Sequence, residues 1–164
     1  MNVTSVKEFY KETFELIPEN ISKEIGHFNV FDVAELIARH GDKPIMPYNR
    51  RAYYKISLIA GRNRAEYADK VIEIEQTALV YASPKVPYHW LPYDRNQQGF
   101  FCIFTDELLT QAKGGSPPED LPIFKAGGFP IFQISLEQHA EIEAIFKKMV
   151  KEMTSDYVYK YDLL

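Results

Sequence analysis

The sequence predicts a mainly β fold, an antiparallel barrel or jelly roll with flanking helices. Three observations lead to this prediction. Apolar residues alternate with a period of two between residues 52 and 105, short candidate strands there are separated by tight turns, and helical patterns occupy both ends of the chain. Short strands joined by tight turns are typical of closed or nearly closed antiparallel sheets. A chain of 164 residues is long enough for one compact domain with a substantial hydrophobic core.

The N-terminal part begins with a helix signal. Ser5 and Glu8 have the spacing of a capping box, in which each side chain bonds the other residue's backbone N–H. An apolar segment over residues 27–31 can form a strand. Asp32 directly after it is a good N-cap for a brief helix over residues 33–39. We therefore expect a helix, a strand and a second helix before the main sheet.

The strands of the central region are predicted from β-branched and aromatic residues in alternation. The segment 61–63 contains glycine and asparagine and reads as a turn, and a hairpin is expected around residues 68–70. In the second arm of that hairpin, Ile72 and Ile74 should point to the face opposite Glu73 and Glu75. The expected strands cover residues 53–59, 64–67, 71–75, 78–82 and 100–104, with one more inside 129–135.

The C-terminal part returns to a helical period. Ser135 and Gln138 form a second capping box, which predicts a helix that begins at Leu136. One face of this helix carries an uninterrupted apolar stripe at helical spacing, whereas charges fill the opposite face. The stripe consists of Ile142, Ile145, Phe146, Met149, Val150 and Met153. Tyr157, Tyr161 and Leu164 restart the pattern, so the chain is expected to be a fragment of a longer protein.

Composition and charge narrow the classes of function. The net charge is −4, which is unlike a domain that binds nucleic acid through its own basic surface. Cys102 is the only cysteine, so an internal disulfide cannot form. Residues 1–14 mix charged with apolar side chains and resemble neither a signal peptide nor a membrane span. We expect a cytoplasmic protein without a membrane partner.

Four segments, taken in order, resemble the N-terminal domain of AraC-type transcription regulators. They are residues 27–31, 47–58, 83–90 and 99–105, and the stretch 155–161 resembles the helical segment that follows this domain in one subgroup. The resemblance implies a cupin-like effector-binding barrel with its N-terminal helix over residues 1–134. It further implies a helical dimerisation segment over residues 135–164. The chain would then be truncated before a missing DNA-binding domain, through which alone it would contact DNA.

The metal ligands of cupin enzymes are not reproduced in this chain. In the register of the family, the positions of the histidine and glutamate ligands fall at Asn49, Arg51, Lys55 and Tyr88. None of these side chains is a usual ligand of a transition metal. His89 is one residue away from the histidine position, and a shift of one residue on a strand points it to the other face. We therefore expect no metal and no other cofactor.

The same family register indicates an effector site inside the barrel. Lys55 would share an inward face with Tyr53 and Ser57, and a buried lysine needs compensation for its charge. The compensation could be an ion pair with Glu66 or Glu73, or an anionic or polyhydroxylated effector. Aromatic faces nearby would suit a sugar or an aromatic ligand. The predicted ligand-binding residues are Arg51, Tyr53, Lys55, Tyr88 and Trp90.

The leading hypothesis is therefore a non-enzymatic sensor that binds a small effector (a sugar, an organic acid or an aromatic acid) and forms a homodimer in the full-length regulator. The predicted dimer interface comprises Ile142, Ile145, Phe146, Met149, Tyr157 and Tyr161. One alternative is a metal-free cupin enzyme, such as a sugar epimerase or isomerase, with Tyr48 or Tyr88 as acid and His89 as base. Another is a dimerisation module whose barrel is filled by its own side chains.

Overall fold

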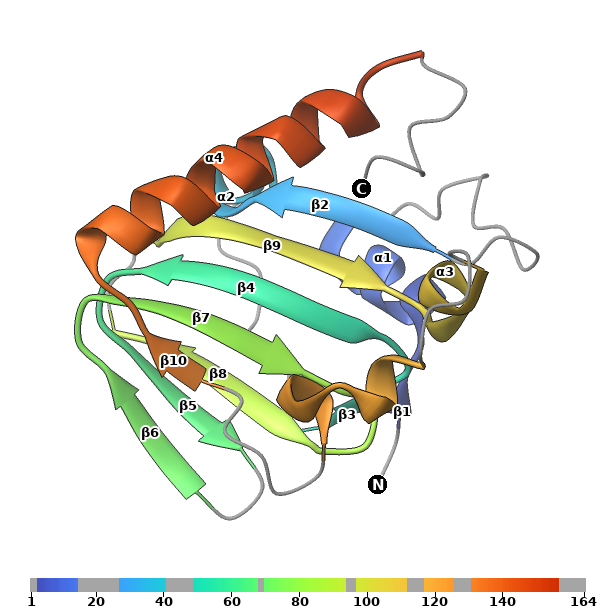
Figure 1. Ribbon diagram of the computed structural model, residues 1–164, viewed down its shortest axis with the longest axis horizontal. Coiled ribbons are helices and arrows are strands. Elements are labelled where there is room, and N and C mark those ends of the chain that lie inside the picture. The colour runs from blue at the N-terminus through green and yellow to red at the C-terminus, as the bar shows by residue number, and fades with distance from the viewer. Residues whose placement is uncertain are drawn as a thin grey trace.

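The computed structural model describes residues 3–14, 27–40, 49–67, 70–93, 97–111, 117–125 and 131–156. These residues form a mainly β domain with flanking helices, which confirms the predicted class (Figure 1). The two larger sheets are antiparallel, and no strand pairing among the described residues closes them into a barrel. None of the helices in these ranges has both the length and the apolar composition needed to cross a bilayer.

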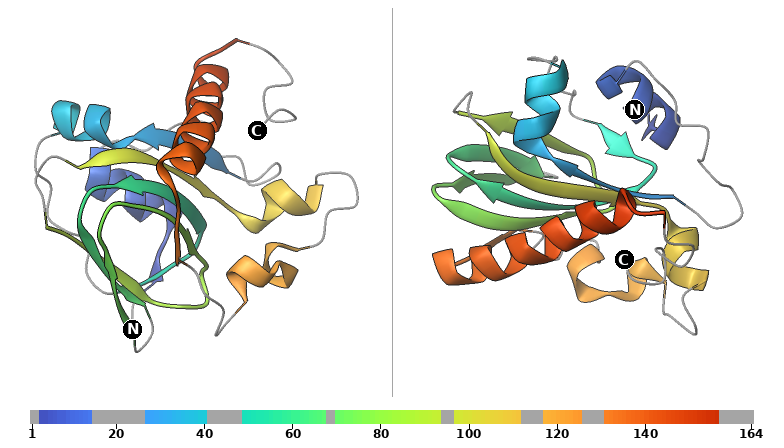
Figure 2. Two further views of the ribbon diagram at one scale, coloured as in Figure 1. Left: turned by 60° about the vertical axis from the view of Figure 1, so that its left-hand side comes forward. Right: turned by 90° about the horizontal axis from the view of Figure 1, so that it is seen from above.

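The larger sheet has five strands in the order β10-β7-β4-β9-β2. The strands are β10 (Ile131–Gln133), β7 (Thr77–Ala82), β4 (Tyr54–Ala60), β9 (Gln98–Phe104) and β2 (Phe28–Asp32). The second sheet has the order β6-β5-β8, with β6 (Lys70–Ile74), β5 (Asn63–Tyr67) and β8 (Tyr88–Pro92). A short parallel pair joins β1 (Val3–Thr4) to β3 (Arg50–Arg51). The five-stranded sheet curls over the three-stranded one (Figure 2).

The outer face of the five-stranded sheet packs against the long helix α4 (Leu136–Met153). Ser135 and Gln138 make the predicted capping box, with backbone-to-side-chain distances of 3.1 and 3.0 Å. Phe146 is buried from the middle of the helix, and its ring stacks on Phe100 at 5.8 Å between centroids. Tyr54, Leu58, Phe100, Cys102 and Phe104 supply much of the sheet side of this core.

The inner face of the same sheet carries the alternate residues and is covered by two helices. The predicted capping box of Ser5 and Glu8 begins α1 (Val6–Phe14), and Asp32 accepts a hydrogen bond from the backbone of Glu35 in α2 (Val33–His40). Phe9 of α1 lies 5.6 Å from the Tyr53 ring and 6.2 Å from the Phe101 ring. The N-terminal helix α1 therefore covers one end of the inner face of the sheet.

A buried polar contact ties α1 to the start of β2. The Tyr10 hydroxyl lies 2.8 Å from Nε2 of His27, and both side chains are buried. The backbone N–H of His27 donates to Oγ1 of Thr105, which connects this point to the end of β9. Burial lowers the pKa of His27 to about 4, so its imidazole is neutral at physiological pH.

Gly99 is required where β9 approaches β4. Its φ is +131°, and a Cβ atom at this position would lie 2.0 Å from the carbonyl oxygen of Leu58. Only glycine combines this backbone conformation with so close an approach. Gly61, in the predicted turn after β4, also has a positive φ of 106°, but a Cβ there would meet no atom within 4 Å.

Several elements were not predicted, because their residues show no clear period. They are β1, β3, β8, the helix α3 (Asp106–Gln111) and two 3₁₀ turns, Pro118–Asp120 and Pro122–Phe124. The second turn places Phe124 in the outer core, 4.9 Å from the Tyr54 ring. Proline at the first position of each turn is a consistent local signal, since its φ suits a helical start.

Candidate functional site

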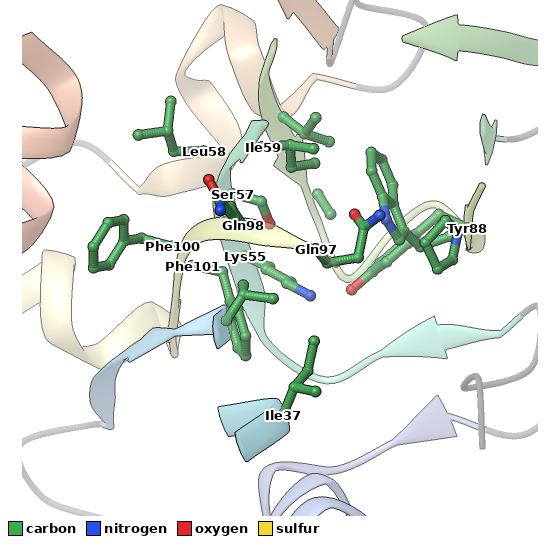
Figure 3. Close-up of a pocket in the computed structure, with 15 residues that line it drawn as sticks. Ile37, Lys55, Ser57, Leu58, Ile59, Tyr88, Gln97, Gln98, Phe100 and Phe101 are labelled. Carbon is green, nitrogen blue, oxygen red and sulfur yellow. The ribbon is translucent and has the colours of Figure 1, made fainter. Parts of the chain in front are cut away.

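A pocket of about 200 Å³ lies between the inner face of the five-stranded sheet and strand β8 (Figure 3). Its walls are mainly aliphatic and aromatic and come from α2, β4, β7, β8 and β9. Val33, Ile37, Ile59, Val80 and Phe101 are among them. Among the described lining residues, the polar side chains that interrupt this surface are those of Lys55, Ser57, Tyr88, Gln97 and Gln98. A mostly apolar pocket with a few polar groups is the usual form of a small-molecule site.

Lys55 carries the positive charge of the pocket. Its side chain extends from β4 into the pocket on the side of Tyr88 and Gln97 (Figure 3), and Nζ lies 4.2 Å from the centre of the Phe101 ring. Burial lowers the pKa of Lys55 to about 8, and the positive charge of Arg51 acts in the same direction. The ammonium is therefore still the main form at pH 7.

No carboxylate among the described residues forms an ion pair with Lys55. The two acids considered from the sequence have other partners. Glu66 pairs with Arg64 at 3.2 Å, and Glu73 accepts hydrogen bonds from the Tyr93 hydroxyl at 3.0 and 2.9 Å. The ion pair of Lys55 with Glu66 or Glu73, one of the two alternatives left open by the sequence, is therefore wrong.

Tyr88 offers a hydroxyl at the edge of the same pocket. It begins β8, and a bridge to Asn49 fixes its backbone, with N–H···O distances of 3.2 and 3.5 Å. Burial raises the pKa of Tyr88 to about 12, against the opposing effect of Arg51, so the phenol stays protonated and can donate a hydrogen bond. Arg51 lies behind it, with the guanidinium carbon 4.8 Å from the centre of the Tyr88 ring.

The structure brings three of the five predicted ligand-binding residues into the pocket. Lys55, Tyr88 and Trp90 line it. Arg51 is 2% exposed, is not among the residues that line the pocket, and lies behind the Tyr88 ring, on β3, which pairs with β1. Tyr53 is also 2% exposed and packs under Phe9, so α1 separates it from the pocket. The predicted positions of Arg51 and Tyr53 in the lining are thus corrected.

His89 lies on the other face of β8 from Tyr88 and Trp90. It is paired across the sheet with Glu66, and its Nδ1 is 3.6 Å from a carboxylate oxygen of that residue. A carboxylate therefore lies beside the ring. The strand alternation nevertheless keeps His89 out of the pocket lining, so it does not converge with Tyr88 on a common substrate position.

The family's metal positions also take structural roles. Asn49 bridges to the backbone of β8, Arg51 is buried behind Tyr88, and Lys55 and Tyr88 enter the pocket. Within the described ranges, no group of three or more histidine, cysteine or acidic side chains is gathered in a way that could hold a metal ion. Burial raises the pKa of Cys102 to about 12, which keeps this thiol protonated.

Residues that sequence reasoning did not assign to the site come from two places. Val33 and Ile37 reach the pocket from α2, and Gln97 and Gln98 reach it from the start of β9. The spacing of Val33 and Ile37, one helical turn apart, was the available signal for α2. The glutamines precede Gly99, whose special backbone marked this stretch, but no periodic pattern pointed to them.

The predicted dimer residues divide into three groups. Phe146 is 3% exposed and belongs to the chain's own core, and Ile142 and Met149 pack against that core while partly exposed. Phe146 is therefore removed from the predicted interface. Ile145 is 55% exposed on the other side of α4. Tyr157 and Tyr161 lie outside the described residues.

Comparison of the sequence with known families and curated proteins identified no relative of this chain. No protein-family model matches the chain, and no curated protein matches it significantly.

Proposed function

We propose that this chain is the effector-binding and dimerisation domain of an AraC-type transcription regulator, with a small molecule bound between the two sheets. In this proposal the five-stranded and three-stranded sheets correspond to the two halves of a cupin-like jelly-roll barrel, with residues 1–134 as the sensor and 135–164 as the dimerisation segment. The protein is cytoplasmic and needs no cofactor, and DNA binding belongs to a separate C-terminal domain.

One observation carries the proposal. An apolar pocket of about 200 Å³ holds a lysine ammonium that no described carboxylate neutralises. Folding a charge into apolar surroundings without a partner is unfavourable. A protein that retains such a residue gains from it when a ligand supplies the opposite charge or hydrogen bonds. Tyr88 beside it is a protonated donor that can orient the same ligand.

A metal-free cupin enzyme has less support. An epimerase or isomerase of this kind needs an acid and a base that face the same substrate carbon. Tyr88 lines the pocket and His89 does not, because adjacent strand residues point to opposite faces.

A thermal-shift screen with a pocket-filling variant tests the sensing role. A ligand that binds only the folded state stabilises it by about 2.7 kcal/mol at roughly 100 times its Kd. The screen would use sugars, organic acids and aromatic acids. The Val80→Phe variant places a large ring at a pocket wall, whereas the control Val71→Phe changes a residue that is 54% exposed. We expect a ligand that raises the Tm of the wild type and of Val71→Phe but not of Val80→Phe.

A screen without any stabilising ligand would favour a dimerisation module whose barrel binds no ligand. If no compound raises the Tm, and Val80→Phe is itself more stable than the wild type, the pocket is a packing defect and not a ligand site. The chain would then be a dimerisation module alone.

The dimerisation role is tested separately on α4. Ile145 is 55% exposed, whereas its neighbour Phe146 is buried in the core. Ile145→Asp should therefore weaken a dimer without unfolding the domain, and sedimentation velocity at several concentrations measures this. Ala144→Asp is a matched control, because it adds the same charge at an exposed position of the same helix. A full-length protein that stays strictly monomeric well above micromolar concentration would contradict the role.

A further inference from the structure

The ligand class follows from the charge balance inside the pocket. Among the described residues, the side-chain charge that most affects the pKa of Lys55 is that of Arg51, which is also positive. The contact that holds the ammonium is the face of Phe101, at 4.2 Å. An aromatic face attracts a cation but does not neutralise it. An anion bound next to Nζ would neutralise this charge, which no carboxylate of the described residues pairs with.

The walls determine the rest of the ligand. Around Lys55 the pocket is formed by the side chains of Ile37, Ile59, Val80 and Phe101, with Trp90 from the opposite sheet. Such walls stabilise an apolar body by excluding water from it. They offer few partners for a ring of hydroxyl groups, each of which would lose hydrogen bonds to water on entering. The volume of about 200 Å³ lies below the usual range for drug-sized ligands, which indicates a small molecule.

We propose that the pocket binds a small monocarboxylate with an apolar aliphatic or aromatic body, its carboxylate on Nζ of Lys55 and its body against Phe101, Trp90 and the aliphatic walls. This inference rests on the proposed sensing function and narrows its effector from three classes to one. The Tyr88 hydroxyl supplies a second donor to the carboxylate. Arg51 keeps its place behind the Tyr88 ring and does not contact the ligand.

Two features of this arrangement select against other ligands. A neutral sugar would leave the charge of Lys55 uncompensated, whatever hydrogen bonds it formed. A dianion would bring a second negative charge into the pocket, where Lys55 is the single cation among the lining residues that the structure describes. A charge buried without a partner is the larger penalty in both cases.

The test compares charged ligands with neutral ligands of the same shape. Calorimetric titration at pH 7 would use benzoate and hexanoate, their amides benzamide and hexanamide, the dianion adipate and the sugar D-glucose. We expect at least one acid to bind, with its amide at least tenfold weaker, since a hydrogen bond to a charged group contributes on that scale. Neither glucose nor adipate should bind as well as the acid.

Substitutions of Lys55 test whether this residue binds the carboxylate of the ligand. Lys55→Met keeps an unbranched side chain that is one atom shorter and removes its charge, so we expect at least tenfold weaker binding of the acid and little change for the amide. Lys85→Met is the control, because Lys85 is an exposed lysine paired with Glu119 at 2.6 Å, away from the pocket lining. Lys55→Arg retains the charge and should retain part of the affinity.

The outcomes separate this inference from the sensing function. Equal binding of acid and amide, or full binding of the acid by Lys55→Met, would overturn the carboxylate assignment. So would binding of glucose with no binding of any acid, although that result would leave the sensing function standing. If none of the acids binds at millimolar concentration, the assignment is also wrong, and the Val80→Phe comparison decides independently whether the pocket binds any ligand.

Discussion

Replacing Lys55 with methionine should stabilise the domain in the absence of ligand. The pKa of Lys55 falls from 10.5 to about 8 on folding, chiefly because of burial. At 1.36 kcal/mol per pH unit, the charged form costs about 3 kcal/mol at pH 7. The contact with Phe101, at 4.2 Å, offsets roughly 0.5–2 kcal/mol of this value. The expected gain from Lys55→Met is therefore about 1–3 kcal/mol.

The gain should depend on pH in a defined direction. Below pH 8 both the folded and unfolded chains hold the proton on Lys55, so the penalty is fully present. Between pH 8 and 10.5 the unfolded chain binds more protons at this residue, so the stability contributed by this site rises with pH. Above pH 10.5 the penalty is gone. The difference between Lys55→Met and wild type should shrink as pH rises across this window.

Urea unfolding at pH 7 and at several values up to pH 10.5 measures both effects. Lys147→Met is the control, because Lys147 is exposed on α4 and its pair with Glu143 should contribute no more than about 0.5 kcal/mol. Two results would contradict the penalty at Lys55: a Lys55→Met variant less stable than wild type at pH 7, or a difference from wild type that is the same at all pH values. Either result would mean that Lys55 has a neutralising partner in the folded chain.

Three further predictions concern the scaffold. Gly99→Ala should lower the free energy of unfolding, measured in urea, by more than about 2 kcal/mol. Gly61→Ala should lower it by only about 1 kcal/mol, because Gly61 has a positive φ but free space around it. Equal effects would contradict the close approach of Gly99 to the Leu58 carbonyl oxygen. Phe146→Ala should cost about 3–5 kcal/mol and Ile145→Ala less than 1 kcal/mol, and the reverse order would contradict the assignment of the α4 faces. The pKa of His27, lowered to about 4, should make the domain lose about 3 kcal/mol between pH 6.5 and 4; NMR titration measures this pKa, and a value near 6.5 would refute its burial as the cause.

Local patterns in the sequence were sufficient for most of the elements. Period-two alternation predicted β4 and β9, and the two capping boxes predicted the starts of α1 and α4, because each depends on neighbours within a few residues. The alternation also predicted that Lys55 and Ser57 share one face of their strand, and both line the pocket. These features require no knowledge of which distant segments meet.

The errors arose where distant segments meet. Tyr53 was expected in the pocket, but α1 covers it through Phe9, and no local pattern indicates where an N-terminal helix docks. Arg51 was expected beside the ligand, but the pairing of β3 with β1 holds it behind Tyr88. The apolar stripe of α4 likewise did not show which of its residues face the sheet. Periodicity predicts which residues share the apolar face of a helix or strand, but it does not predict which other element packs against that face.

Only one β-sheet layer separates the pocket from α4. Lys55 of β4 faces the pocket, while its neighbours Tyr54 and Ile56 pack on the side of α4; Phe101 and Phe100 divide in the same way on β9. Because close-packed interiors transmit displacement instead of absorbing it, a shift of β4 or β9 on one side must be accommodated by the helix on the other. The pocket and α4 therefore lie on opposite faces of the same two strands, with one layer of peptide backbone between them.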